Sequence, residues 1–519
     1  MPSGTETRMS VDRRKFLQRS FAAAAFAFVE SGCRSRSSDT RAVTEADPDR
    51  AVAPDLELSL RAAPDTIALL DGKATDVWRF SSRIVRGSRD ALVDQEAGYL
   101  GPTLRVKRGQ RVRVHLDNAL SEATIVHWHG LDVAARADGH PGDAVGAGGT
   151  YLYDFEVDNR AGTYWYHSHP ADRTGPQVYR GLAGLLLVTD DVEQSLGLPD
   201  GDRELTLVLQ DRTFDGDNQL VYVPDPMIGF LGDDVLVNGR PARTHEVRRG
   251  PHRLRILNGS NSRIYDLGWS DGSPMIVLGT DGGLLAAPRE RSHVVLAPGQ
   301  RLDLWASFGE RPGDDVWLES RAFDGVGGMT GMGMMGRRAR SRATTIAHGA
   351  PMRIQRFVAV GDAARGGPPE RLAAEPGPPA AEVSNPGAPR TFTTAMRMMR
   401  WSLNGRTFEM RGVAPNERVR LGAVEEWEFV NPAGPMAMAH PIHIHGSQFQ
   451  IIERRSGSGA LALHDGILDE GWQDTFLLLP GDSVRVRITF KRHAGLFLYH
   501  CHNLEHEDLG MMRNYLVES

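Results

Sequence analysis

The sequence predicts an all-β protein built from Greek-key β-sandwich domains. Glycine and proline are frequent, with 57 and 30 residues among 519. Short apolar stretches with period-2 alternation end in turns, which is typical of strands in sandwiches. Apolar residues at helical spacing are scarce. A chain of this length is expected to fold as about three domains.

The charge balance excludes one class of partner. Lysine and arginine number 60 against 66 aspartate and glutamate residues, which gives a net charge of −6. Proteins that bind nucleic acid need a basic surface to meet its phosphates, and this mixed composition offers none. We therefore expect no nucleic-acid partner, and we expect the chain to act as a monomer.

Residues 1–33 are expected to be an export signal rather than part of the fold. Asp12-Arg-Arg-Lys-Phe-Leu-Gln18 precedes an apolar run from Phe21 to Val29, an order that resembles a twin-arginine export signal. The run is about half of what a bilayer-spanning helix needs, which favours a signal over a membrane anchor. A disordered basic tail is the alternative. The signal predicts a periplasmic protein.

Cys33 follows the apolar run as a lipoprotein cysteine does, although Glu30 stands where a small or aliphatic residue is usual. Cys33 is either lipidated, which would hold the protein at a membrane, or removed with the leader. In both cases it cannot pair with Cys501, the second of the two cysteines. An unpaired thiol in an oxidising compartment needs protection, and a bound metal would supply it.

Three stretches along the chain repeat the order of alternating strand, turn and second alternating strand. They are Gly101–Asn118, Val235–Gly259 and Trp401–Asn431. The repeats predict three sandwich domains at residues 55–195, 196–365 and 390–519. Residues 34–54 read as a linker, and the proline-rich stretch 366–389 reads as a second one. The methionine-rich segment 327–336 is expected to be a mobile loop in the second domain.

Ten of the 18 histidines lie in four clusters. The clusters are His127-Trp-His129, His167-Ser-His169, His440-Pro-Ile-His443-Ile-His445, and His500-Cys-His502 with His506. Residues i and i+2 of a strand share a face, so each cluster contains a pair of imidazoles that point the same way. The four pairs supply eight imidazoles. Cys501 must point away from the two histidines beside it, toward a second site.

That second site has the ligands of a blue-copper electron-transfer centre, which are a thiolate, two imidazoles and a weak axial thioether. Cys501, His506 and His440 supply the first three. Met511 or Met512 can supply the thioether, and they face opposite ways in an extended segment. Zinc also binds cysteine and histidine. However, ten histidines with one cysteine exceed a tetrahedral zinc site, and imidazole also suits copper.

An internal comparison places the eight imidazoles between two domains. Gly162–His169 reads like a copy of Gly495–His502, with Ser168 in place of Cys501. The first domain therefore keeps an inward histidine pair but cannot build a blue-copper site. A lone His-X-His is often incidental, but four clusters in the first and third domains only argue against that interpretation.

The motifs HWHG, HSH, HPIHIHG and HCHNLEHEDLGMM resemble those of the three-domain multicopper oxidases, over residues 55–519. The resemblance implies three cupredoxin domains and four copper ions. A type 1 copper would take electrons from substrate, and a trinuclear centre of one type 2 and two type 3 coppers would reduce O2 to water. The implied type 1 ligands are His440, Cys501, His506 and Met511. The implied type 2 ligands are His127 and His443, and the implied type 3 ligands are His129, His167 and His502 on one ion and His169, His445 and His500 on the other.

The resemblance assigns roles to two acidic residues near these motifs. Asp138 and Glu507 match carboxylates that the family places near the trinuclear centre, which implies proton delivery, with Asp138 also orienting a ligand histidine. Asp474, in Gly471–Thr475, is expected to be structural. The bonds from Cys501 into His500 and His502 would give the electron its route.

Two substrate classes stay open, phenolic or aromatic reductants and Cu(I). Methionines before His440, at Met436 and Met438, and in the segment 327–336 favour Cu(I), because thioethers are soft ligands. The long methionine-rich insert of cuprous oxidases is missing, and Met436 stands where they carry a substrate-binding aspartate. Methionine also lines adaptable apolar pockets. A copper-binding envelope interaction protein, or a copper buffer without turnover, is the alternative from another class.

Overall fold

The computed structural model describes residues 52–94, 98–242, 244–309, 315–324, 326–327, 345–397, 400–457 and 461–519. The predicted export signal with Cys33 lies outside the described residues, as does most of the methionine-rich segment 327–336. Val52–Ser519 forms one compact unit. Within the described part, helices are too short or too polar to cross a membrane.

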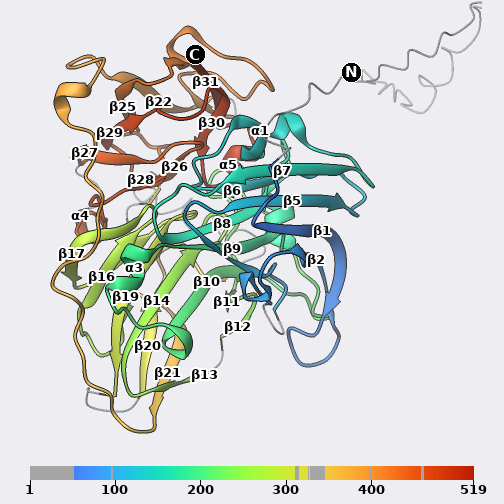
Figure 1. Cartoon of the computed structure of the whole chain (residues 1–519), viewed down its shortest axis with the longest axis vertical. Helices are drawn as coiled ribbons and strands as arrows, with labels where there is room; N and C mark the ends of the chain where they lie inside the picture. The colour runs from blue at the N-terminus through green and yellow to red at the C-terminus, as the bar shows by residue number, and fades with distance from the viewer. Residues whose placement is uncertain are drawn as a thin grey trace, which may run out of the picture. The chain divides into compact units, whose positions relative to one another are not determined.

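The prediction of an all-β fold is confirmed, because the described strands pair into sheets that face one another as three sandwiches (Figure 1). In the first sandwich the sheets have the orders β2-β1-β5-β7 and β3-β4-β9-β8-β6. Its strands are β1 (Leu56–Ile67), β2 (Thr75–Arg86), β3 (Leu92–Val93), β4 (Thr103–Lys107), β5 (Arg111–Asn118), β6 (Val126–His129), β7 (Thr150–Glu156), β8 (Gly162–Ser168) and β9 (Ala183–Thr189).

The second sandwich has the sheet orders β12-β11-β10-β14-β19-β16-β17 and β13-β21-β20-β15-β18. Its strands are β10 (Glu204–Arg212), β11 (Asp234–Val237), β12 (Arg240–Pro241), β13 (Thr244–Arg248), β14 (Gly250–Asn258), β15 (Tyr265–Trp269), β16 (Met275–Thr280), β17 (Gly283–Arg291), β18 (Val294–Leu296), β19 (Arg301–Phe308), β20 (Asp315–Ser320) and β21 (Met352–Val360).

The third sandwich has the sheet orders β23-β22-β25-β29-β27 and β24-β31-β30-β26-β28. Its strands are β22 (Arg390–Arg397), β23 (Arg400–Leu403), β24 (Arg418–Arg420), β25 (Val424–Val430), β26 (His440–Ile444), β27 (Phe449–Arg455), β28 (Thr475–Leu478), β29 (Ser483–Thr489), β30 (Gly495–Cys501) and β31 (Met512–Glu518). The short helices of the whole unit are α1 (Ala135–Asp138), α2 (Thr174–Arg180), α3 (Asp191–Ser195), α4 (Leu461–His464) and α5 (Leu504–Asp508).

The three sandwiches share one topology. One sheet of each sets two strands side by side in parallel, β1 with β5, β10 with β14, and β22 with β25. The facing sheet does the same with β4 and β9, β13 and β21, and β24 and β31. Parallel neighbours cannot be joined by a hairpin, so the chain crosses between the two sheets of each sandwich.

The three predicted sequence repeats are only partly equivalent in the structure. Their second strands, β5, β14 and β25, occupy the same place in their sandwiches. Their first strands do not, because β11 and β23 are antiparallel hairpin partners of β10 and β22, whereas β4 lies in the opposite sheet. The strand equivalent to β11 and β23 is β2. Period-2 alternation reveals a strand with one buried face but not the sheet that it joins.

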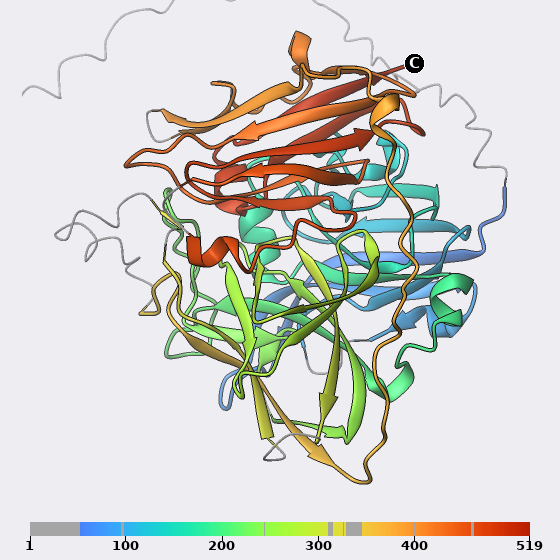
Figure 2. The same cartoon turned by 90° about the vertical axis from the view of Figure 1, so that its left-hand side faces the viewer.

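The proline-rich stretch 366–389 carries no strand and runs extended along one side of the unit (Figure 2). Glu375 in this stretch accepts a hydrogen bond at its carbonyl from Trp472 Nε1, at 2.9 Å, and pairs with Arg108 of the first sandwich. The stretch is therefore fastened to the surface on its way to β22.

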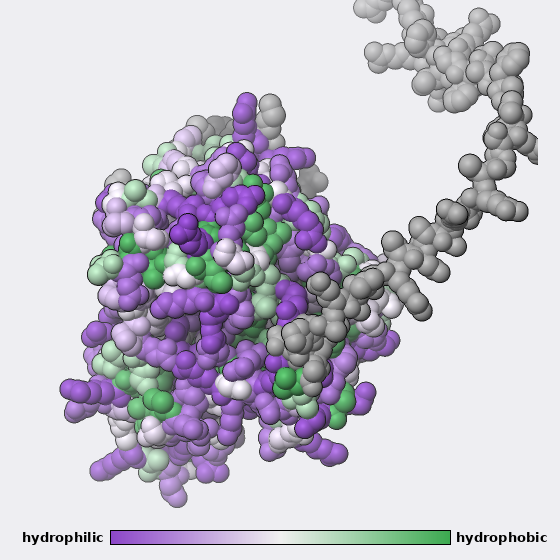
Figure 3. Space-filling model, turned by 45° about the horizontal axis from the view of Figure 1, so that its top comes forward, coloured by the Kyte–Doolittle hydropathy of each residue, from purple (hydrophilic) through white to green (hydrophobic). Residues whose placement is uncertain are grey.

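Hydrophilic side chains cover most of the face in Figure 3, with hydrophobic ones gathered between them.

Each sandwich packs around its own core, and alternation along the strands fills it. In β29, Val484, Val486 and Ile488 are buried while the residues between them are half-buried, as a strand with one core face requires. Trp427 of β25 is fully buried in the same core. Its ring centroid lies 4.9 Å from that of Phe392 and 5.5 Å from that of Tyr515.

Trp427→Ala should therefore destabilise the third sandwich by about 3–5 kcal/mol, because it leaves a cavity among aromatic rings. Calorimetry of the copper-free protein should show a lower melting temperature. Trp317→Ala, at a half-buried position of β20, is the control and should lower it less. Equal shifts would contradict the assignment of Trp427 to a closely packed core.

Candidate metal centre

Strands of the first and third sandwiches bring the four histidine clusters together. In the first sandwich β6 pairs with β8, and His127 lies opposite His167. In the third, β26 pairs with β30, and His443 lies opposite His500. Ladder partners share a face of the sheet, so each pairing joins two clusters. All ten clustered histidines are fully buried.

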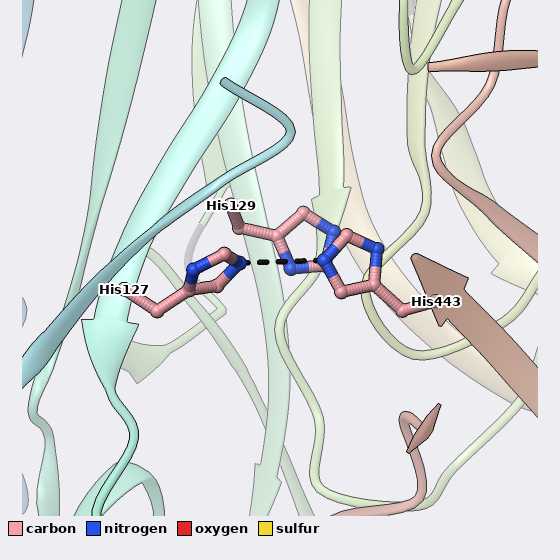
Figure 4. A group of neighbouring side chains, drawn as sticks. All are labelled: His127, His129 and His443. Carbon is pink, nitrogen blue, oxygen red and sulfur yellow. Dashed lines mark hydrogen bonds between the residues drawn. The ribbon is translucent and has the colours of Figure 1, made fainter. Parts of the chain in front are cut away.

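Eight of these histidines form one continuous site, as the sequence predicted from strand alternation. They fall into groups of three whose ligand atoms lie within 4.8 Å of one another. The groups are His127, His129 and His443 (Figure 4), then His129, His167 and His502, then His169, His445 and His500. His129 joins the first two groups, and a further group of His127, Asp138 and His445 joins the first to the third, so the site is continuous. Each group contains residues of both sandwiches.

The hydrogen bonds around the site fix which ring nitrogen faces inward. His127 Nδ1 donates to the Asp138 carbonyl at 2.7 Å, and His443 Nδ1 donates to the Asp474 carbonyl at 2.8 Å. Burial lowers the pKa of both imidazoles well below the usual range, so each is neutral and carries one proton. The Nε2 atom of each therefore presents a lone pair to the site.

These lone pairs face one another. The Nε2 atoms of His127 and His443 are 3.3 Å apart, and those of His445 and His500 are 3.0 Å apart. Other inward nitrogens, such as His129 Nδ1 and His167 Nε2, are buried with no hydrogen-bond partner. Facing lone pairs repel, and unpaired buried polar atoms cost free energy. Cations between them remove both penalties, so this donor set fits metal ions.

Cys501 faces a separate group, away from its two neighbours. Its Sγ lies 3.5 Å from His440 Nδ1 and 3.7 Å from His506 Nδ1, and the two Nδ1 atoms are 3.3 Å apart. Burial raises the pKa of the Cys501 thiol, so a thiolate here needs a bound cation. The Trp401 ring covers this group, with centroids 4.4 Å from His506 and 4.8 Å from His440.

The second sandwich also reaches the Cys501 group. His506 Nε2 donates to the backbone carbonyl of Met227 at 2.9 Å, which leaves the His506 Nδ1 lone pair for a metal. The Pro226 carbonyl next to it accepts from Trp401 Nε1 at 2.9 Å. A loop of the second sandwich therefore covers the outer edge of this group.

The two methionines separate along the ladder of β30 and β31. Met512 lies opposite His500, so it shares a face with the eight-histidine side. Met511 N donates to the His506 carbonyl at 2.9 Å, and the Met511 carbonyl accepts from Cys501 N at 3.0 Å. Met511 is fully buried in the third core beside Cys501. Met511 therefore stays the predicted thioether ligand.

The two carboxylates that the sequence singled out both contact the histidines. Asp138 Oδ2 accepts from His445 Nδ1 at 2.8 Å. Burial raises the pKa of Asp138 well above its usual range. Glu507 accepts from Thr174 Oγ1 at 2.7 Å and lies 3.1 Å from His500 Nδ1. Burial acts to raise its pKa, but His169 and His500 outweigh this and lower it.

From the sequence Asp474 is expected to be structural, and its contact with the histidines was not predicted. Its Oδ1 lies 3.0 Å from His129 Nε2, and its carbonyl accepts from His443 as described above. The one sequence feature that could have pointed to Asp474 is its position directly before the strand that begins at Thr475. Only the pairing of that strand, β28, with β26 puts Thr475 opposite His443 and Asp474 beside the site.

The comparisons with known proteins agree with this geometry. Models described as multicopper oxidase match residues 82–193 and 382–519, which hold all ten clustered histidines. A laccase from Bacillus stratosphericus is 30% identical over 482 residues, covering 80% of this chain and 88% of that protein. The chain belongs to the multicopper oxidase family.

One solved structure and one further relative are also similar to this chain. The crystal structure of the McoA multicopper oxidase from the hyperthermophile Aquifex aeolicus has a TM-score of 0.74 and 33% identity, covering 90% of this chain and 97% of that one. The cell division protein FtsP of Sodalis glossinidius is 31% identical over 451 residues, covering 85% of this chain and 87% of that protein. The predicted resemblance and the cupredoxin-type fold are confirmed. As a multicopper oxidase, the protein is an oxidoreductase with copper cofactors.

Cys501→Ser should empty the group that it forms with His440 and His506 and leave the eight-histidine site loaded, because the side chain faces only the former. Copper analysis should show the loss of a single ion, and the blue absorption of a copper–thiolate bond should vanish. His464→Ala, outside the four clusters, is the control. Loss of all copper from Cys501→Ser would contradict the separation of the two sites.

Proposed function

We propose that this protein couples one-electron oxidation of a substrate to four-electron reduction of O2 to water. The observation that carries the proposal is the position of Cys501 in the chain. Its thiol faces His440 and His506, while His500 and His502, bonded to it on either side, belong to two different histidine groups. An electron that enters at the thiol therefore has a short covalent route to both groups.

The ligand groups support four copper ions. His440, Cys501, His506 and Met511 would hold type 1 copper, and His127 and His443 would hold type 2. His129, His167 and His502 would hold one type 3 ion, and His169, His445 and His500 the other. Copper bound here would supply the one-electron steps and the binding of O2. Neutral imidazoles and a thiolate are better ligands for copper than for hard cations such as Mg²⁺ or Ca²⁺.

Asp138 and Glu507 would manage the protons that water formation consumes. Burial keeps a proton on Asp138 at a pH where an exposed aspartate is ionised, while the histidines around Glu507 favour its ionised form. Two carboxyl groups with pKa values displaced in opposite directions suit a proton donor and a proton acceptor. Asp138 also fixes the orientation of His127 and His445 through its two contacts.

The alternative is a copper-binding cell-envelope interaction protein without oxidase turnover, and the likeness to a cell division protein keeps a function other than oxidation open. The complete set of buried ligands argues against a copper-free envelope protein, because unpaired buried imidazoles and a buried thiol are costly when no metal binds them. A copper buffer would not need histidines matched across two sandwiches.

We propose export to the periplasm by the twin-arginine route, supported by Arg13 and Arg14 before the apolar run.

The purified, copper-loaded protein should show intense blue absorption that a reductant bleaches and air restores, with O2 consumed in proportion to substrate oxidised. The reason is that the type 1 site accepts electrons and passes them to the O2 site. Cys501→Ser should consume no O2. A colourless wild-type protein that holds no copper after reconstitution would refute the oxidase proposal.

Substrate electrons would enter through a layer of methionines. Both type 1 histidines, His440 and His506, are fully buried. Met227, Met396 and Met438 are half-buried and pack against the core of the third sandwich, which contains Cys501. Met436, two residues before Met438, is 44% exposed. Apolar thioethers can contact an aromatic ring or bind Cu(I). The proposed substrates are therefore phenolic or aromatic reductants, Cu(I), or both.

Met438→Leu should distinguish the two substrates, because leucine keeps the apolar volume and loses the sulfur. We expect a several-fold loss in kcat/KM for Cu(I) and little change for hydroquinone, measured side by side by O2 uptake. Met352→Leu, at a half-buried position in the second sandwich, is the matched control. Equal effects of Met438→Leu on both substrates would show that its sulfur binds no Cu(I).

A further inference from the structure

Asp474 contacts two histidines, His129 and His443, that both belong to the group with His127. Its Oδ1 lies 3.0 Å from His129 Nε2, and its carbonyl accepts from His443 Nδ1 at 2.8 Å. The two imidazoles are stacked, with ring centroids 3.7 Å apart and an interplanar angle of 11°. Asp474 is fully buried, so no water competes for these contacts.

The contact with His129 has a chemical consequence. When His129 Nε2–H donates a hydrogen bond to the Asp474 carboxylate, the lone pair of the neutral ring must lie on Nδ1. His129 Nδ1 is buried, faces the site and has no hydrogen-bond partner. The carboxylate therefore selects the tautomer that a metal needs. Thr475 Oγ1, at 3.2 Å from the same Nε2, donates to Asp474 Oδ1 at 3.0 Å.

Arg301 of the second sandwich holds the carboxylate in place. Its Nη1 donates to Asp474 Oδ1 at 2.7 Å, and its Nη2 donates to Oδ2. The same guanidinium donates through Nε to the Thr163 carbonyl of the first sandwich, at 2.9 Å. Arg301 is 2% exposed. Arg301 therefore contacts residues of all three sandwiches beside the histidines. Its planar guanidinium can donate two parallel hydrogen bonds to one carboxylate.

The glycine of the HWHG motif makes room for this pair. Gly130 has φ +87°, and a Cβ there would collide with Asp474 Oδ2 and lie 2.8 Å from Arg301 Nη2. Asp281 supports the opposite side, because its Oδ1 accepts from Arg301 N at 2.7 Å and its Oδ2 from Thr475 N at 3.1 Å. Residues of all three sandwiches therefore shape the site of a single ion pair.

We propose that Asp474, held by Arg301, is a positioning residue for the trinuclear centre. It fixes the tautomer and orientation of His129 and holds His443 through its carbonyl. By this route the second sandwich controls the O2 site, although among its described residues none belongs to the metal-binding groups. This inference rests on the proposed oxidase function. It goes beyond that function by naming the residues that set the geometry of its O2-reducing half.

The test compares Asp474→Asn and Arg301→Lys with a matched control, Glu417→Gln. Glu417 forms an equally buried two-pronged pair with Arg513 in the third sandwich, at 2.7 Å for both contacts. Its other hydrogen bonds within the described residues come from Ala414 N and Tyr499 OH rather than from a clustered histidine. Three measurements are made on each copper-loaded protein. They are the anaerobic bleaching of the blue colour by hydroquinone, its return in air, and the rate at which a chelator removes type 2 copper, followed by electron paramagnetic resonance.

We expect Asp474→Asn to keep the blue colour and its anaerobic bleaching, because the type 1 site is untouched. Reoxidation in air should slow, and type 2 copper should leave faster, each by about 10–100-fold, as is typical when a partner of a metal ligand is lost. Arg301→Lys should show a smaller change in the same direction. A purely structural role would instead affect bleaching and reoxidation alike.

Reoxidation and copper loss in Asp474→Asn equal to those of Glu417→Gln would overturn the inference. If Asp474→Asn does not yield blue protein, Arg301→Lys decides on the same measurements. The wild-type protein separates the two proposals. A wild-type protein without blue colour or O2 uptake refutes the oxidase function, whereas an active wild-type protein with an unaffected Asp474→Asn refutes only the role of Asp474.

Discussion

The structure depends on the burial of neutral imidazoles whose lone pairs face one another. The Nε2 atoms of His127 and His443, 3.3 Å apart, have no solvent and no donor between them. Such a cluster is unfavourable unless cations occupy it. The lone pairs of His127, His443 and His445 point inward because the other ring nitrogen of each donates to a fixed acceptor outside the cluster. The acceptors include the Asp138 carboxylate and the carbonyls of Asp138 and Asp474. The architecture of the first and third sandwiches serves to hold those acceptors.

The second sandwich supports both histidine sites, although no residue that the structure describes in it belongs to a metal-binding group. At the Cys501 group it supplies the Met227 carbonyl that fixes the tautomer of His506. At the eight-histidine site it supplies Arg301, which fixes Asp474. Gly299 of this sandwich also packs against His502, since a Cβ there would lie 3.0 Å from the ring. The second sandwich therefore helps to determine which ring nitrogens of His506 and His129 carry a proton, and metal affinity and reactivity depend on this.

Much of the fold was predictable because strand alternation is local. The buried face of β29 and the turns between strands can be read from residue order alone. The equivalence of the three repeats could not, because β4, β11 and β23 have similar patterns and join different sheets. A period of two tells which residues point inward but carries no information about the neighbouring strand. That choice depends on contacts between residues far apart in sequence.

The same division holds for the site. The sequence by itself determined that Cys501 faces one site and His500 and His502 another, since adjacent residues of a strand point to opposite faces. It also singled out Asp138 and Glu507 by their motifs. Only the tertiary structure decided that Asp474 contacts His129, that Arg301 reaches it from another sandwich, and that Met227 covers His506. These contacts join segments more than 150 residues apart, and no local pattern records which distant backbone or side chain a folded chain will bring to a given atom.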